Sequence, residues 1–486
     1  MNLKIVLLVF QAVFAFLGLL LVRSMLRVRT LFDLLNVFFI LASATVVFFL
    51  ANRKLWLGFA LSSWMVSVSI ARPPLDSFTV GFLIYGLICG LFVIEKIMQR
   101  KAFFSLKGWG NCLLLVATAL LFIRFFMDRP GSARMGGIGG LRNALGYTAV
   151  LPFFFISEQL GREQTGKQTR SFLRVICWVG ISMVFWRLFR RLMGTSAQPI
   201  YMAWYEGSLW LLMPLALAWL LYRRNQEGSS PVPSILFSLF MLLLGVLSPF
   251  RSRIYFALAS IAAVFWCSGY RRRFVIGSAI VLSLLMPLLV VIPRQHIPVF
   301  ARRALSTVLP FDRADLDAVR ERGVNVSSEY GWGSGFRAFL FQAAANNIKR
   351  NPWMGQGWGV SRDDLVLASS LDPAERLMYA LVAAGEYHNS LLTVAVKSGL
   401  PAGLLTAIGF VLVGVSCFRN VDRVPSGELK MLYVGVVGAL VTITGQMLMN
   451  GSYSELQGVA IYLGFLHGTL ASPAVRVEEN RIEAAS

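Results

Sequence analysis

A single histidine stands where a polar stretch gives way to an apolar run, in "GEYHNSLLTVAVKSGL" at residues 385–400. The chain has three histidines in 486 residues, and the one in this stretch is His388. An imidazole has an ordinary pKa of about 6.5 and can accept a proton from a reacting hydroxyl group. It can equally cap a helix or lie in a core, bonded to Glu386 or Tyr387. The sequence therefore predicts either a general base or a structural histidine here.

Arginines form the second group of residues with evident chemistry. Arg251 and Arg253 lie between two apolar runs, where a charge is costly without a partner. A planar guanidinium donates two parallel hydrogen bonds to a phosphate group, which an ammonium does not. We interpret these two as phosphate-binding residues, with Arg134 and Arg142 on the same side of the predicted membrane. Some of the other arginines on that side have the alternative of extending to lipid headgroups, namely Arg23, Arg27 and Arg29.

Other kinds of site have no signature in the sequence. The stretch "GQGWGVS" at 355–361 lacks the Lys-Ser/Thr pair of a P-loop, so no nucleotide cofactor is expected. No His, Asp, Glu or Cys cluster has the spacing of metal ligands, and the five cysteines lie in or beside apolar runs as inert core residues. His296 and His467 are interpreted as structural or interfacial. The net charge of +22 favours anionic membrane lipids and lipid phosphates as partners, rather than nucleic acid.

The elements that must position these residues are membrane helices. The chain is 56% hydrophobic and 14% charged, and a helix needs roughly 20 apolar residues to cross a bilayer. We predict an all-α integral membrane protein of about 12–14 transmembrane helices, whose first apolar run is retained rather than cleaved. The expected spans are 3–22, 31–50, 55–71, 76–94, 112–127, 144–158, 172–189, 203–222, 232–250, 254–268, 274–293, 390–418, 431–449 and 456–471.

The distribution of basic residues orients this bundle. The loops expected on the cytoplasmic side carry clusters of lysine and arginine, such as Arg53-Lys54 and Arg271-Arg272-Arg273. This assignment places both termini in the cytoplasm and the long 294–387 segment outside. Within that segment, Ser334 and Pro352 mark the start and the end of a predicted helix, "SGFRAFLFQAAANNIKR". The expected domains are an N-terminal bundle 1–293, an extracytoplasmic helical loop 294–387, C-terminal transmembrane helices 388–472 and a cytoplasmic tail 473–486.

Four stretches occur in an order that resembles a known superfamily. They are "GGLRNALGY" (139–147), "FRSRIYFALA" (250–259), "RAFLFQAAANNIKRNPWMGQGWG" (337–359) and "HNSLLTVAVKSGL" (388–400). The chain resembles the O-antigen ligase and O-antigen polymerase superfamily of membrane glycosyltransferases. In that pattern Ser-Arg opens a span, an arginine precedes an external helix ending in N-P-x-x-G-x-G, and His-Asn is followed after nine residues by Gly. The matching residues are Ser252, Arg253, Arg337, Asn351, Pro352, Gly355, Gly357, His388, Asn389 and Gly399; Ala402 departs from the small or polar residue preferred there.

The resemblance implies a fold of the large lipid-linked glycosyltransferase type. Its members take a glycan from a polyprenyl diphosphate on the outer face of the bacterial inner membrane. The acceptor is another lipid-linked repeat for a polymerase and lipid A-core for a ligase. By this resemblance His388 is the catalytic base and the donor diphosphate binds the arginines, without metal or cofactor. Glu386, Asn389, Gly355, Gly357 and Gly399 are supporting residues.

Two alternatives remain at this point. The count of about fourteen spans exceeds the dozen or so usual for the ligase, which slightly favours a polymerase. A flippase for lipid-linked glycans would also be basic and multispanning, but it has no use for a large external segment that leads into His-Asn.

Four aromatic residues near the predicted membrane boundary are interpreted either as platforms for sugar rings or as interfacial anchors. They are Tyr330, Trp332, Trp353 and Trp358.

Overall fold

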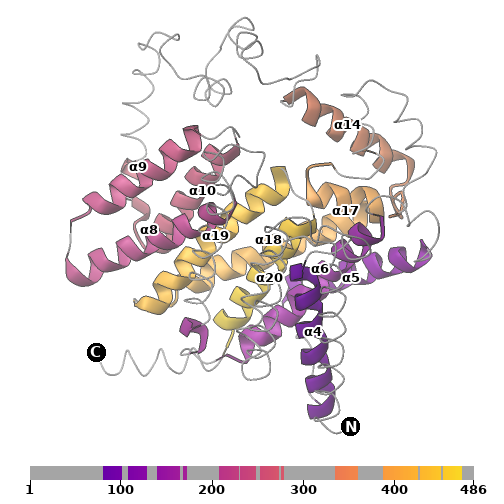
Figure 1. The fold of residues 1–486 in the computed structure, drawn as a ribbon, viewed down its shortest axis with the longest axis horizontal. Coiled ribbons are helices and arrows are strands. Elements are labelled where there is room, and N and C mark those ends of the chain that lie inside the picture. Colours follow the sequence, from indigo (N-terminus) through magenta and orange to yellow (C-terminus); the bar gives the residue numbers. More distant parts are fainter. Residues whose placement is uncertain are drawn as a thin grey trace, which may run out of the picture. The chain divides into compact units, whose positions relative to one another are not determined.

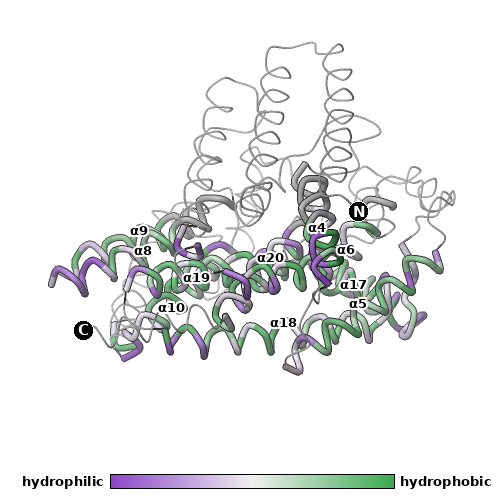
Figure 2. Tube along the Cα trace, turned by 90° about the horizontal axis from the view of Figure 1, so that it is seen from below, coloured by the Kyte–Doolittle hydropathy of each residue, from purple (hydrophilic) through white to green (hydrophobic). Residues whose placement is uncertain are grey.

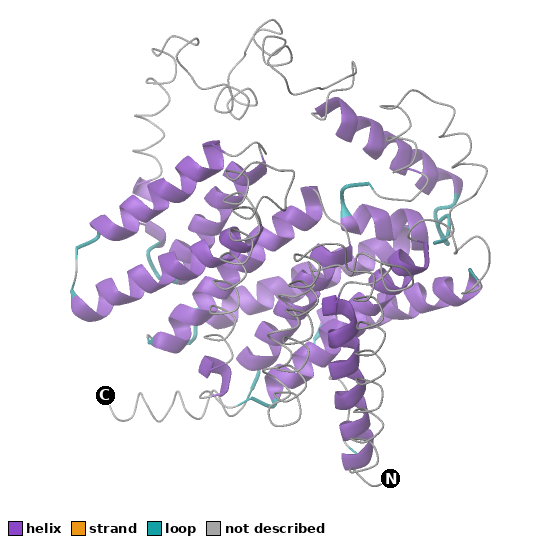
Figure 3. Ribbon diagram, viewed as in Figure 1, coloured by secondary structure: helices purple, strands orange, loops and turns teal. Residues whose placement is uncertain are grey.

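The structure is a computed structural model of the chain. It describes residues 80–100, 108–128, 140–164, 168–171, 207–228, 230–247, 252–272, 275–277, 334–358, 382, 387–424, 427–449 and 453–472. Within these ranges the regular structure is entirely helical (Figure 3). The helices are α4 (Val80–Gln99), α5 (Trp109–Met127), α6 (Gly140–Arg162), α8 (Gly207–Glu227), α9 (Val232–Leu247), α10 (Ser252–Cys267), α14 (Ser334–Arg350), α17 (Ser390–Ser398), α18 (Leu400–Val421), α19 (Glu428–Met449) and α20 (Tyr453–Leu470).

Most predicted spans that fall on described residues coincide with a helix. In the described part of the chain, three helices are long and apolar enough to cross a membrane, namely α5, α18 and α19. Two shorter apolar stretches there, Val232–Leu243 and Arg253–Cys267, lie in α9 and α10. The predicted helix from Ser334 to the residues before Pro352 is confirmed as α14. The spans predicted at 3–22, 31–50, 55–71 and 172–189, and nearly all of 274–293, lie outside the described residues.

The chain divides into two compact units, Met1–Ser105 with Ser171–Ala203, and Leu106–Arg170 with Trp204–Ser486. Helix α4 belongs to the first unit, and the other helices named above belong to the second. In the second unit α6 packs against α20, α5 against α18, and α19 against both α8 and α10 (Figure 1). Each candidate site residue in the described ranges therefore lies in the second unit.

Small residues allow these helices to approach closely. Where α5 crosses α18, a Cβ on Gly110 would lie 2.8 Å from Val413, and one on Gly409 would lie 2.7 Å from Leu114. Small residues serve this purpose in membrane helices, where lipid is as apolar as the side chains. The opposite side of α18 exposes large apolar residues, and the tube of Figure 2 shows hydrophobic stretches along the helices. The exposed residues on α18 include Leu404, Ile408, Val411 and Val415.

The structure corrects one predicted element. The span expected at 390–418 is two helices, α17 and α18, separated by Gly399. Gly399 has φ +96°, which breaks the helical backbone, and Pro401 lies in the first turn of α18, where its missing N–H costs nothing. Apolar residues on both sides of Lys397, Ser398 and Gly399 led to the prediction of one span.

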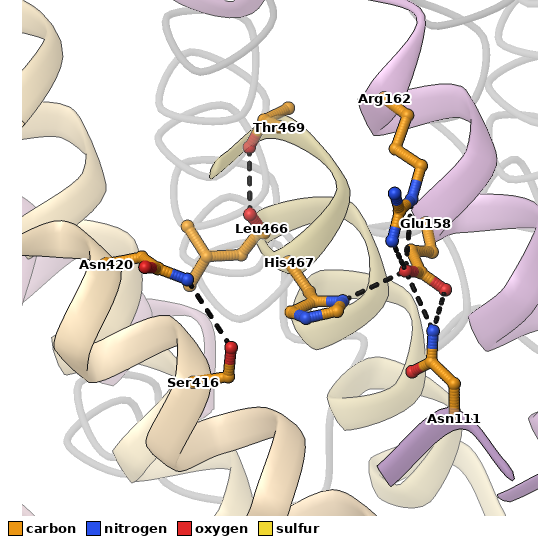
Figure 4. Close-up of polar contacts among 8 residues, drawn as sticks. All are labelled: Asn111, Glu158, Arg162, Ser416, Asn420, Leu466, His467 and Thr469. Carbon is orange, nitrogen blue, oxygen red and sulfur yellow. Dashed lines mark hydrogen bonds and ion pairs between the residues drawn. The ribbon is translucent and has the colours of Figure 1, made fainter. Parts of the chain in front are cut away.

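A buried carboxylate joins α5, α6 and α20 (Figure 4). The Glu158 side chain is 1% exposed and accepts hydrogen bonds from Asn111 Nδ2 at 2.8 and 2.9 Å and from Arg162 Nη2 at 2.6 Å. His467 Nδ1 lies 3.0 Å from Glu158 Oε1. A buried charge requires such partners, so this network favours one register of the three helices. His467, interpreted from sequence as structural or interfacial, lies in it.

We expect Glu158→Ala to destabilise the protein strongly. Removing one member of a buried ion pair typically costs about 3–5 kcal/mol, and the partial exposure of Arg162 favours the lower end. Glu227→Ala is the matched control, because Glu227 forms an i,i+4 pair with Arg223 in which both side chains are more than half exposed. Thermal unfolding in detergent should show a clearly lower midpoint for Glu158→Ala and little change for Glu227→Ala. Equal midpoints would contradict the importance of the network.

Candidate active site

The residues on either side of His388 are anchored. Tyr387 is 0% exposed and packs with Leu340 and Ala344 of α14 and with Val396. Its hydroxyl accepts a hydrogen bond from Asn347 Nδ2 at 2.8 Å, and burial raises the pKa of Tyr387, so that the hydroxyl stays neutral at physiological pH. Tyr387 therefore fixes the chain just before His388 and supplies no ionised group there.

The residue that follows, Asn389, caps α17. Its backbone is extended, with φ −149°, and its side-chain oxygen accepts the N–H of Leu392 at 3.0 Å. Asparagine is among the preferred residues at this position, because the first N–H groups of a helix have no partner within it. The supporting role predicted for Asn389 thus includes a structural one.

His388 lies between these anchors in a left-handed backbone conformation, with φ +51°. Its side chain is half-buried, and its Nε2 atom is among the buried ones. Such a conformation is uncommon outside glycine, although histidine is enriched in it, and it persists only where the surroundings enforce it. The backbone at His388 is therefore held by Tyr387 and Asn389 rather than by its own preference.

The N-P-x-x-G-x-G stretch packs directly on the elbow between α17 and α18. Gln356 N–H donates to the Val396 carbonyl at 2.8 Å, Gly357 N–H to Lys397 at 3.0 Å, and Leu400 N–H to Pro352 at 2.8 Å. Backbone can approach backbone so closely only without side chains in between. A Cβ on Gly399 would lie 2.0 Å from the Trp353 carbonyl oxygen, and one on Gly355 would lie 2.5 Å from the Lys397 carbonyl carbon. The structure thus brings together the three glycines predicted as supporting residues.

Aromatic residues bind the end of this stretch to α6 and α20. Trp358 is 1% exposed and stacks on Tyr147, with ring centroids 5.3 Å apart. Tyr147 in turn meets Tyr453 edge to face at 6.1 Å. Both sequence-based interpretations of Trp358 are therefore wrong, because a ring buried against tyrosine neither holds a sugar nor lies at the lipid boundary. Trp353 is 76% exposed, which fits both a platform for a sugar ring and an interfacial anchor.

Arg253 and His388 both lie near the C-terminal end of α19. A Cβ on Gly445 would lie 2.5 Å from the ring of Phe256, three residues after Arg253. Ser390, two residues after His388, donates to the Met447 carbonyl at 3.4 Å. Arg253 is the second residue of α10, and its side chain is half-buried. One end of the bundle therefore holds a histidine and an arginine.

Five other predicted residues lie wholly or by their side chains outside the described part of the chain. Arg142 and Arg337 lie near the starts of α6 and α14, with side chains outside the described part. Arg134, Arg251 and Glu386 lie outside the described residues.

Sequence reasoning missed Arg124 and Asp128 at the end of α5, which contact Gly357 and Trp358. Their four-residue spacing on one helix was the available signal.

Membrane-length helices with a histidine and an arginine at one end of the bundle define a polytopic membrane protein with a candidate active site. A family model described as O-Antigen ligase matches residues 235–407, just over a third of the chain. This match supports the resemblance to the O-antigen ligase superfamily that the motifs predicted, and it favours a glycosyltransferase-type membrane enzyme at the level of the family. No curated protein matches the chain.

Gly399→Ala should damage the elbow more than the loss of glycine alone explains. Gly269 has a similar φ of +82° with open space around its Cβ position, so Gly269→Ala carries the backbone strain without the overlap. We expect the overlap with Trp353 to add about 1–3 kcal/mol of destabilisation, a typical cost of overpacking. Thermal midpoints of the two variants in detergent measure the difference. Equal shifts would show that close approach at Gly399 is unimportant.

Proposed function

We propose that this protein joins a glycan carried on a polyprenyl diphosphate to an acceptor hydroxyl, on the outer face of the bacterial inner membrane. The observation that carries the proposal is the enforced left-handed backbone of His388, next to the motif stretch that packs on the α17–α18 elbow. Strained backbone persists at functional sites because the surroundings compensate for it. The superfamily match over 235–407 supports the reaction type.

In the proposed reaction His388 is the general base. The acceptor oxygen forms a bond to the anomeric carbon of the donor sugar, and the hydroxyl proton moves to the imidazole of His388. The bond from that carbon to the diphosphate oxygen breaks, and the polyprenyl diphosphate leaves with the electron pair. Proton removal by a positioned base is worth about 10²- to 10⁴-fold in rate.

Arg253 is proposed to stabilise the departing diphosphate. A guanidinium aimed at the developing charge lowers the barrier without a metal ion, because its dipoles and charge are already in place. Among the described residues no group of three His, Cys, Asp or Glu side chains is placed to hold a metal ion. Arg251, Arg337, Arg134 and Arg142 are proposed to extend this phosphate site.

The proposed roles predict that three variants lose transfer activity in the purified protein. Arg253→Lys keeps the charge and loses the bidentate fork, so turnover should fall strongly. His388→Ala should lose about 10²- to 10⁴-fold in rate, and His388→Asn should lose as much, although asparagine tolerates the left-handed backbone.

Wild-type turnover should survive EDTA and should fall at acid pH as the imidazole protonates. Near-native turnover of folded His388→Asn would remove His388 from the mechanism, and a requirement for Mg²⁺ would contradict the arginine role.

The same site fits a polymerase and a ligase, and we slightly favour a polymerase because the predicted spans number about fourteen. Deletion of the gene should then leave a single repeat on the lipid A-core and remove the long chains. Loss of every repeat, with lipid-linked polymer accumulating, would indicate a ligase instead. Electrophoresis of the surface glycan distinguishes the two. A flippase would show no transfer in detergent, where there is no second compartment.

A further inference from the structure

A carboxylate at the end of α5 holds the motif stretch. Asp128 is the C-terminal cap residue of α5, and each of its oxygens has a different partner. Oδ1 lies 2.9 Å from Arg124 Nη2, and Oδ2 accepts the backbone N–H of Trp358 at 2.7 Å. Both side chains of the ion pair are 14% exposed, so the pair is largely shielded from water. A charge-assisted hydrogen bond in such a setting is stronger than a neutral one.

The second glycine of the motif makes room for this ion pair. Gly357 has φ +89°, and a Cβ at this position would lie 2.3 Å from Arg124 Nη2 and 2.6 Å from Asp128 Oδ1. The backbone of the stretch therefore lies directly against the Arg124–Asp128 pair. The glycine is explained by the carboxylate and guanidinium beside it, not by a phosphate loop.

The held stretch is connected to His388 through one short helix. Gln356 and Gly357 donate to the carbonyls of Val396 and Lys397 in the last turn of α17. Helix α17 has nine residues and begins directly after the cap Asn389, so a displacement of its last turn is transmitted to its start. Asp128, on a helix far from His388 in sequence, is thus connected to it through α17.

We propose that Asp128 is a positioning residue for the transfer reaction. With Arg124 it holds residues 355–358 against α17 and so fixes the imidazole of His388 relative to the acceptor hydroxyl. This inference rests on the proposed function, in which His388 is the base. Asp128 touches no reacting atom, so its loss should lower kcat and leave the donor KM nearly unchanged.

The test compares Asp128→Ala, Asp128→Asn and Asp422→Ala in purified full-length protein. Asp422 is the matched control, because it also caps the C-terminus of a helix and pairs with an arginine, Arg271. The first readout is kcat and KM with a lipid-linked glycan donor. The second, independent of activity, is hydrogen–deuterium exchange of the backbone amides at 355–358, with α19 as the internal reference.

Asp128→Ala should lower kcat by about 10- to 100-fold, a typical effect of misplacing a reacting group by about 1 Å. Exchange at 355–358 should accelerate without a change in α19. Asp128→Asn keeps an oxygen that accepts the Trp358 N–H, so it should recover much of both losses. Asp422→Ala should match the wild type in both readouts. If Asp128→Ala is not recovered folded, Asp128→Asn and Arg124→Gln replace it, with smaller losses of the same kind.

Three outcomes would overturn the inference. Unchanged exchange at 355–358 would show that Asp128 does not hold the stretch. Faster exchange with unchanged kcat would show that the contact is structural only, while the proposed function stands. An inactive wild-type protein whose exchange still depends on Asp128 would refute the proposed function, and the role in transfer with it.

Discussion

The contact between the N-P-x-x-G-x-G stretch and the α17–α18 elbow is the constraint on which the candidate site depends. Three backbone hydrogen bonds join the two segments, and the close approach requires that Gly355 and Gly399 carry no side chains, while Gly357 makes room for the Arg124–Asp128 pair. Each glycine also adopts a positive φ that other residues rarely do. Residues 352–357 and 396–400, which are distant in the sequence, thereby form one packed unit, and His388 lies just before it in the chain.

This unit is held by three helices, α5, α6 and α20, which also contact one another at their opposite ends. Helices α5, α6 and α20 supply Asp128, Tyr147 and Tyr453 near the motif stretch. The same three helices meet again at the Glu158 network (Figure 4). Contacts at both ends restrict sliding and rotation of each helix, which contacts at one end would allow. Charged groups serve this purpose because a buried carboxylate out of register loses its partners.

Local signals in the sequence predicted much of the fold and little of this bracing. Ser334 and Pro352 bounded α14 correctly, because such start and stop signals act on their own neighbours in the chain. The break at Gly399 was missed, since apolar residues resume directly after it. Asn111 and Glu158 are separated by 47 residues, and Trp358 and Asp128 by 230. Such pairings depend on helix packing, which no local pattern encodes.

The order Tyr-His-Asn in the motif has a physical explanation in the contacts of its three residues. Tyr387 is buried under α14, and its hydroxyl accepts a hydrogen bond from Asn347. The side-chain oxygen of Asn389 caps α17. Fixing both neighbours forces His388 into a conformation that it does not prefer by itself. A base must be held within a fraction of an ångström to act, and a side chain on a backbone fixed at both sides meets this need at the cost of local strain. In the proposed reaction, the asparagine that follows the histidine therefore acts by fixing the backbone that carries the base.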